Sequence, residues 1–362
     1  MIMARRQAFL AMLVLLAPIA QAGGSDGSDE HGRSNWLLFG NADANALEGD
    51  ASLYDSTDLV VAADLLGSWE TGSFRILGEL FLSTEEQELE RLQLGWEVVP
   101  ETYAWLGRFH QPGSAWNTRY HHGQFLQPSI TRPTIESWED EGGVLPQHLV
   151  GALGETRLQL ADESGFLLAA GAGIGPVMTP SGLAPVSLFH ARGVERRPTF
   201  SFRAAFLQDL ASDDGIELVA MRSEIGLSDS GYAGPSSHVD LDAVGLSLGW
   251  ALQRWQLVST IYAMNAKFVG DGGGNDEFFA GYLQLSRKLG RGLSLLGRFE
   301  GSAHTNDSRY LALFPDFVSQ RAVFDLRWDL APQQALSLEF AAAQGRYGNF
   351  QELRLQWSAV FP

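Results

Sequence analysis

Hydrophobic and polar residues alternate along most of the chain, in segments that are separated by turn-forming residues. In the clearest segment, Arg321 to Leu330, every even-numbered residue is apolar and four of the five odd-numbered residues are charged. Because successive side chains of a strand point to opposite faces, this pattern predicts strands with one apolar and one polar face. Sixteen such segments occur, each of roughly 9 to 12 residues, the length that a tilted strand needs to cross a bilayer. Their approximate extents are 35–43, 57–68, 73–83, 88–98, 102–110, 148–160, 166–175, 199–209, 216–226, 239–250, 255–267, 278–288, 293–302, 321–330, 335–344 and 350–361.

The connections between these segments alternate between short and long. Short turns include 69–72, 162–165, 212–215 and 331–334, whereas long loops include 111–147, 176–198, 227–238 and 303–320. Short turns on one rim and long loops on the other are typical of a transmembrane barrel, and a soluble sandwich has no reason to sort its loops in this way. The sequence therefore predicts an all-β fold, a transmembrane antiparallel β-barrel of about 16 strands.

The longest connection, residues 111–147, contains too many aromatic residues, prolines and histidines for a solvated linker. We therefore expect it to be ordered. It follows the strand predicted over 102–110, in which the aromatic side chains are expected on one face and Arg108 and His110 on the opposite, water-facing side.

The first 22 residues have the pattern of a cleaved signal peptide. Arg5 and Arg6 precede an apolar run that ends in a small-x-small cleavage site before Gly23. The run is about 13 residues long, which is too short for a membrane-spanning helix. We therefore predict export of the chain to the outer membrane of the cell.

Removal of this peptide would leave a flexible polar arm, 23–34, and a single barrel domain, 35–362, and would take the net charge from −18 to −20. The acidic balance, with only two lysines, argues against a nucleic-acid partner. The chain has no cysteine, which excludes disulfides, thiolate metal sites and a thiolate nucleophile.

In the last predicted strand, apolar residues share one face and end at Phe361, while polar residues share the other. With these features the chain resembles the porin-like outer-membrane barrels of Gram-negative bacteria. The segment GRFHQPGSAWNTRYHHGQFLQPSITRP is similar to one found in members of that group that have no assigned solute. The last strand of such proteins ends in an aromatic residue that the barrel assembly machinery recognises; here Pro362 follows that position, which is a departure from the pattern.

The resemblance implies a passive channel for small polar or charged solutes. Such a channel contacts outer-membrane lipid and can assemble as a homotrimer. In general porins the long loop after the fifth strand folds into the lumen and narrows it. The longest loop here, 111–147, also follows the fifth predicted strand, so the same placement is expected for it.

A pore constriction is the first candidate site. Acidic residues of the long loop would face basic residues of strands three to five across water, which would select solutes by charge. The alternative is that all of these groups are ordinary solvated charges. The candidate residues are Arg75, Arg91, Arg108, His110, Glu136, Glu139, Asp140 and Glu141.

A second candidate site is metal binding by the histidines of this region, which are His110, His121, His122 and His148. Adjacent His121 and His122 would point to opposite sides of an extended segment, so both cannot easily bind one ion. Hydrogen bonding inside a packed loop is the preferred interpretation. We expect no metal site and no cofactor.

An enzyme is the alternative of another class, because some outer-membrane barrels are phospholipase-like hydrolases. No Ser/His/acid spacing is evident in the chain. We expect no catalytic residues. A third alternative is a surface or structural barrel whose lumen is filled; bilayer conductance would separate a channel from both alternatives.

Overall fold

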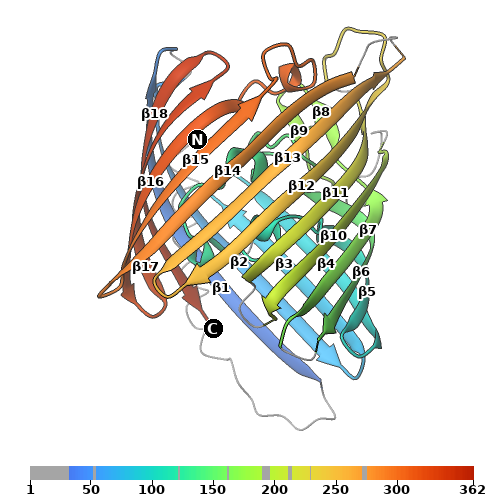
Figure 1. The fold of residues 1–362 in the computed structure, drawn as a ribbon, viewed down its shortest axis with the longest axis vertical. Coiled ribbons are helices and arrows are strands. Elements are labelled where there is room, and N and C mark those ends of the chain that lie inside the picture. The colour runs from blue at the N-terminus through green and yellow to red at the C-terminus, as the bar shows by residue number, and fades with distance from the viewer. Residues whose placement is uncertain are drawn as a thin grey trace.

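A computed structural model describes residues 32–51, 54–120, 123–160, 163–189, 196–210, 214–228, 230–270 and 275–362. Sixteen antiparallel strands form one closed barrel, so the predicted fold class and strand number are confirmed (Figure 1). The strands are β1 (Arg33–Gly49), β2 (Ser56–Thr71), β3 (Phe74–Ser83), β4 (Gln87–Val99), β5 (Thr102–His110), β6 (His148–Gln159), β7 (Gly165–Ile174), β10 (Pro198–Asp209), β11 (Asp214–Gly226), β12 (His238–Leu252), β13 (Trp255–Val269), β14 (Asn275–Gly290), β15 (Leu293–Ala303), β16 (Val318–Ala331), β17 (Gln334–Gly345) and β18 (Gly348–Phe361).

The barrel closes between its first and last strands. β1 pairs with β18 in an unbroken antiparallel register that runs from Leu38 opposite Phe361 to Gly49 opposite Phe350. On its other side β1 pairs with β2. Each remaining strand pairs with its neighbours in the chain, apart from the short hairpin β8 (Val177–Thr179) and β9 (Gly182–Ala184), which lies between β7 and β10 in sequence and forms a separate sheet.

The alternation of the sequence corresponds to two distinct faces of the wall. In β16, Phe324 and Trp328 are exposed on the outside, whereas Val323 and Asp325 are buried. The same division holds in β12, where Val244 and Leu246 are exposed and Ala243 and the other odd-numbered residues nearby are buried. An outward band of apolar side chains is what a lipid-facing barrel requires.

Loop lengths are sorted between the two rims, as predicted. The connections at one rim, such as 72–73, 253–254, 291–292 and 332–333, have two residues each, whereas the other rim carries 111–147, 175–197, 227–237 and 304–317. The connection 346–347 is a tight turn on the long-loop rim. Gly107, within β5, has a positive φ of 137°.

The expected alternation in β5 ends at this glycine, because Arg108, Phe109 and His110 are all buried. The alternation predicts that Arg108 and His110 face water on the side opposite the aromatic residues. The structure differs from this prediction, because both side chains are buried. A backbone with positive φ changes the direction of the side chains that follow it.

Among the residues that the structure describes, no helix is long and apolar enough to cross a membrane.

The predicted signal peptide and most of the predicted polar arm lie outside the described residues, which begin at Gly32. β1 starts at Arg33, two residues before the strand expected from the sequence.

Candidate functional site

Segment 111–147 joins β5 to β6. Its described residues, 111–120 and 123–147, contain three short helical turns, α2 (Ala115–Thr118), α3 (Gly123–Leu126) and η3 (Thr134–Glu136). Its hydrogen bonds reach strands on different sides of the barrel. The backbone N–H of Gly123 donates to Asp64 of β2 at 3.1 Å, and the Tyr120 hydroxyl accepts from Gln256 of β13 at 2.8 Å. The described residues of the segment therefore contact strands on different sides of the barrel.

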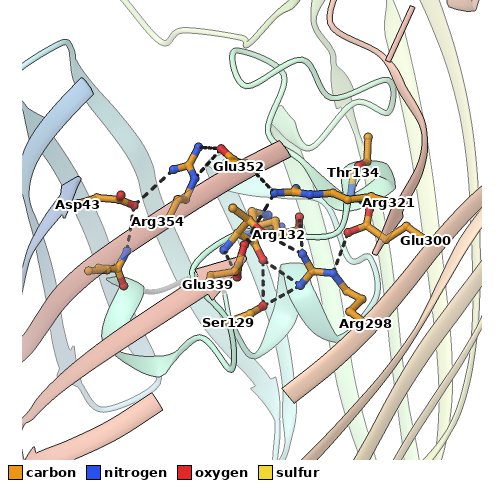
Figure 2. Close-up of polar contacts among 12 residues, drawn as sticks. Asp43, Ser129, Arg132, Thr134, Arg298, Glu300, Arg321, Glu339, Glu352 and Arg354 are labelled. Carbon is orange, nitrogen blue, oxygen red and sulfur yellow. Dashed lines mark hydrogen bonds and ion pairs between the residues drawn. The ribbon is translucent and has the colours of Figure 1, made fainter. Parts of the chain in front are cut away.

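One anchor of the segment is Arg298 of β15, whose side chain is fully buried. Its guanidinium pairs with Glu300 at 2.8 Å and donates to the Ser129 hydroxyl at 2.7 Å and the Thr131 carbonyl at 2.9 Å (Figure 2). Glu300 in turn accepts a hydrogen bond from the backbone N–H of Thr134 at 2.6 Å. Charge-assisted hydrogen bonds of this kind are the strong ones, so this part of the segment is held firmly against β15.

A row of alternating charges continues from Arg298 along the inside of the neighbouring strands (Figure 2). Arg321 of β16 lies 2.6 Å from Glu352 of β18 and 3.7 Å from Glu339 of β17. Arg354 of β18 pairs with Glu352 at 2.8 Å and with Asp43 of β1 at 3.3 Å. The inward position of these side chains could be read from the alternation, but the pairing between strands could not.

A large apolar cluster lies under the other side of the segment. The inner faces of β11 to β14 contribute Val219, Met221, Ile225, Val239, Leu241, Ala243, Val258, Tyr262, Met264, Ala266, Phe268, Phe278, Ala280 and Tyr282. Trp116, Ile135, Val144 and Leu145 of segment 111–147 pack on them, together with Met178 and Leu183 of β8–β9 and Tyr310, Leu311, Phe314 and Phe317. An apolar inner wall differs from the polar interior of a typical porin, and it is covered by three connecting segments.

Glu136 lies in the middle of this packing and is fully buried. Its carboxylate accepts hydrogen bonds from the Ser114 hydroxyl at 2.5 Å and the Tyr262 hydroxyl at 3.2 Å. Burial raises the pKa of Glu136, while the Ser114 hydrogen bond and the charge of Arg132 oppose that shift. Glu136 therefore fixes the segment to β13 and does not face water.

The basic residues predicted at the constriction form ion pairs within their own part of the wall. Arg91 lies 2.6 Å from Glu79, and Arg108 pairs with Glu88. Arg75 lies 3.4 Å from Glu70 and 4.3 Å above the ring of Tyr103. None of these ion pairs involves the acidic residues of segment 111–147, so the predicted opposition of the two groups is not seen in these contacts.

Glu139 is buried beside His148, the first residue of β6. Its carboxylate accepts from the backbone N–H groups of Gln147 at 2.6 Å and His148 at 2.9 Å, and it lies 2.8 Å from Nδ1 of the His148 ring. Burial alone would raise the pKa of Glu139, but the His148 ring and these N–H groups hold it below the usual value. The ring of His110 lies against that of His148, with 4.8 Å between centroids. His121 and His122 lie outside the described residues.

Asp140 and Glu141 have solvent-exposed side chains. Partial enclosure by the surrounding protein, followed by the charge of Asp140, raises the pKa of Glu141 to about 7. The pKa of Asp140 is also raised, by enclosure and by Glu139. Glu86, in the connection between β3 and β4, has its pKa raised to about 7 by desolvation and by Asp140. The charges of Glu141 and Glu86 therefore change near neutral pH.

No known family model matches the chain, and no curated protein resembles it in sequence. The fold, in contrast, is similar to those of solved outer-membrane proteins. In-vitro folded OmpT, an outer membrane protein of Vibrio cholerae, superposes with a TM-score of 0.62 at 9% identity, over 94% of this chain and 100% of that one.

Two further solved structures are similar over almost their whole length. An anion-selective porin from Comamonas acidovorans has a TM-score of 0.59 at 14% identity, over 91% of this chain and 100% of that one. The outer membrane channel DcaP of Acinetobacter baumannii has a TM-score of 0.57 at 12% identity, over 93% and 100%. The chain therefore has the fold of bacterial outer-membrane porins.

Proposed function

We propose that the protein is an outer-membrane channel for passive diffusion of small polar or charged solutes, and that segment 111–147 crosses its lumen and restricts the path. The observation that carries the proposal is the spread of the hydrogen bonds of the segment, which join β2, β11, β13 and β15–β18. A chain segment bonded to strands around a closed barrel of this size narrows the aqueous channel that such a barrel otherwise leaves.

The solutes are proposed to pass the acidic group of Glu86, Asp140 and Glu141. Exposed acids in a narrow water-filled space favour cations over anions, because a low-dielectric wall focuses their field. The buried Glu136 and Glu139 are held by hydrogen bonds to fixed partners, and we propose that they contribute to the shape of the path rather than to its selectivity.

Removal of the segment is expected to increase conductance several-fold. Gln111 and Gln147 already continue the ladder between β5 and β6, with N–H to carbonyl at 2.8 Å, so an Asn-Gly turn can join them directly. The single-channel conductance of the shortened and the parent barrel would be compared in planar bilayers. Circular dichroism and resistance to unfolding by sodium dodecyl sulfate would establish that the shortened barrel is folded.

The same comparison tests a second candidate, a barrel with a filled lumen, which the apolar cluster inside β11–β14 favours. If the parent protein does not conduct and the shortened barrel does, the result would support a barrel with a filled lumen. Equal conductance of the two proteins would exclude segment 111–147 as the restriction. A conducting parent whose conductance rises on shortening is the result that the channel proposal requires.

Charge selectivity is expected to depend on pH and on the exposed acids. As the pH rises through about 7, Glu141 and Glu86 lose protons and the lumen becomes more negative, so preference for cations should increase. The reversal potential under a potassium chloride gradient at pH 5.5 and pH 8.5 measures this change. Replacing Asp140 by asparagine and Glu141 by glutamine should shift the channel toward anions and reduce the pH dependence.

A matched control for this experiment is Glu48→Gln, because Glu48 is exposed on the outward-facing side of β1. It should leave the reversal potential unchanged. Salt should weaken the effect of the two lumen substitutions, since the screening length falls from about 10 Å at 0.1 M to about 3 Å at 1 M. An unaltered reversal potential of the double variant at low salt would remove Asp140 and Glu141 from the ion path.

The proposal includes no catalytic role, and absence of lipid hydrolysis by the folded protein is its expected result.

OmpT of Vibrio cholerae has also been solved in a trimer form, with a TM-score of 0.57 at 8% identity. We extend the proposal to a homotrimer in outer-membrane lipid, assembled by the barrel assembly machinery through the last strand. Delivery of the chain by a cleaved signal peptide is part of the same proposal.

A further inference from the structure

Two histidines meet where segment 111–147 leaves the wall and where it returns. His110 is the last residue of β5 and His148 is the first residue of β6, and they are partners in the antiparallel register. Their side chains are 4% and 2% exposed, and both lie close to Glu90 of β4. The Glu90 carboxylate is 2.8 Å from Nε2 of His148 and 3.6 Å from Nε2 of His110.

Glu90 reaches the histidines because β4 contains a bulge. Glu79 pairs with Arg91 and Leu80 pairs with Leu89, so Glu90 is the extra residue between two consecutive pairs. In a regular strand its even-numbered position would place it on the outward face, with the exposed Leu92 and Leu94. A bulge redirects a side chain, and here it brings the carboxylate to the two imidazoles.

The three donor atoms have the spacing of a small metal site. All of them lie within 4.8 Å of one another. Tetrahedral zinc, with ligands at about 2.0 to 2.2 Å, needs donors separated by about 3.3 Å. The distances from the Glu90 carboxylate to Nε2 of His148 and of His110, 2.8 and 3.6 Å, lie on either side of that value. Small side-chain movements would therefore bring Glu90 and the two imidazoles to the separations that zinc needs.

The surroundings orient the ligands. Nδ1 of His148 lies 2.8 Å from the buried Glu139 carboxylate, which favours the tautomer that leaves Nε2 available for a metal. The ring of Trp138 lies 4.9 Å from both imidazoles, centroid to centroid, and supplies an apolar wall. Glu90 is 16% exposed, which gives an ion a route from the solvent.

We propose that Glu90, His110 and His148 bind one divalent transition-metal ion of the zinc class, with Glu139 as the residue that positions His148. Two imidazoles and one carboxylate are a donor set that suits zinc, and they leave a fourth coordination position for water or a solute. The rival interpretation is a purely structural ion pair, in which a protonated His148 bridges Glu90 and Glu139 without a metal.

The test is zinc binding to the complete barrel, prepared without a histidine tag, folded in detergent and stripped with a chelator. Isothermal titration with zinc chloride and metal analysis after dialysis should find one tightly bound zinc ion per barrel. The variants His110→Gln and Glu90→Gln should each lose that equivalent of zinc. Glu139→Gln should weaken zinc affinity by about 10- to 100-fold, the usual effect of altering a partner that orients a metal ligand.

His110→Gln separates the two interpretations, because it removes a ligand and leaves the contacts between His148 and its two carboxylates in place. It should fold as the parent does and no longer be stabilised by zinc against urea. His238→Gln is the matched control, since His238 lies 3.3 Å from Asp240 in a second cluster, with Glu224. It should retain the equivalent that His110→Gln loses. Absence of a tightly bound equivalent in the parent, or equal affinity in the parent, His110→Gln and Glu90→Gln, would overturn the proposal.

Discussion

Substitution of Arg298 by methionine is expected to destabilise the barrel by about 3 to 5 kcal/mol, the range found when one partner of a buried ion pair is removed. Methionine fills a similar volume, so the loss comes from charge and hydrogen bonding. Glu300 would keep a buried carboxylate without its closest cation, and the Thr131 carbonyl and the Ser129 hydroxyl would lose their donor. Urea-induced unfolding in lipid vesicles, followed by tryptophan fluorescence, measures the change.

Arg287→Met is the control for this substitution. Arg287 of the adjacent strand β14 is exposed and lies 4.8 Å above the ring of Trp255, an arrangement worth about 0.5 to 1 kcal/mol. The two variants remove the same group from neighbouring strands, and only one of them removes it from the interior. Similar losses in both would mean that Arg298 does not anchor segment 111–147.

Arginine in place of Leu246 is expected to cost about 2 to 4 kcal/mol, because it would put a charge on the lipid-facing side near the middle of the bilayer. Leu246 is 60% exposed on the outer face of β12, and its partners in the register, Leu218 and Ile261, are exposed apolar residues as well. The free energy of unfolding in lipid vesicles is the quantity to measure.

Depth in the membrane provides a matched control within the same strand. Leu252 also points outward, is 63% exposed and ends β12 beside the turn to β13. Leu252→Arg should therefore cost only about 0 to 1 kcal/mol, the value for a charge near the membrane interface. An equal cost at the two positions would contradict the placement of the bilayer around the middle of β12.

The strands could be predicted from the sequence because each carries its own signal. Alternation defines a strand and its two faces locally, and the sorted loop lengths define the two rims. Both signals fail where the backbone is irregular. Gly107 interrupts the alternation before His110, and the bulge that turns Glu90 inward depends on pairing with β3, which β4 alone does not reveal.

The candidate site was harder to predict because alternation says only whether a side chain faces inward. Position around the barrel depends on closure and on the path of segment 111–147. The sequence therefore suggested that Arg75, Arg91 and Arg108 face the acids of the segment across water. It did not indicate that Arg298 of β15 would bind the segment. One signal was present in the sequence: Trp255–Val269 is apolar on both faces, which is unusual for a strand with water on one side.

The ladder between β1 and β18 has a consequence for how the barrel forms. Gly49 and Phe350 are the paired residues of this ladder with the smallest separation in sequence, and they are still about 300 positions apart. Most other ladders join strands that are consecutive in the chain. Local hairpins can form early, but this long-range pairing requires almost the entire chain to be in place. Until then both terminal strands present unpaired backbone groups that can recruit another molecule. Closure is accordingly the slow and aggregation-exposed step of folding, and assistance during assembly is most valuable there.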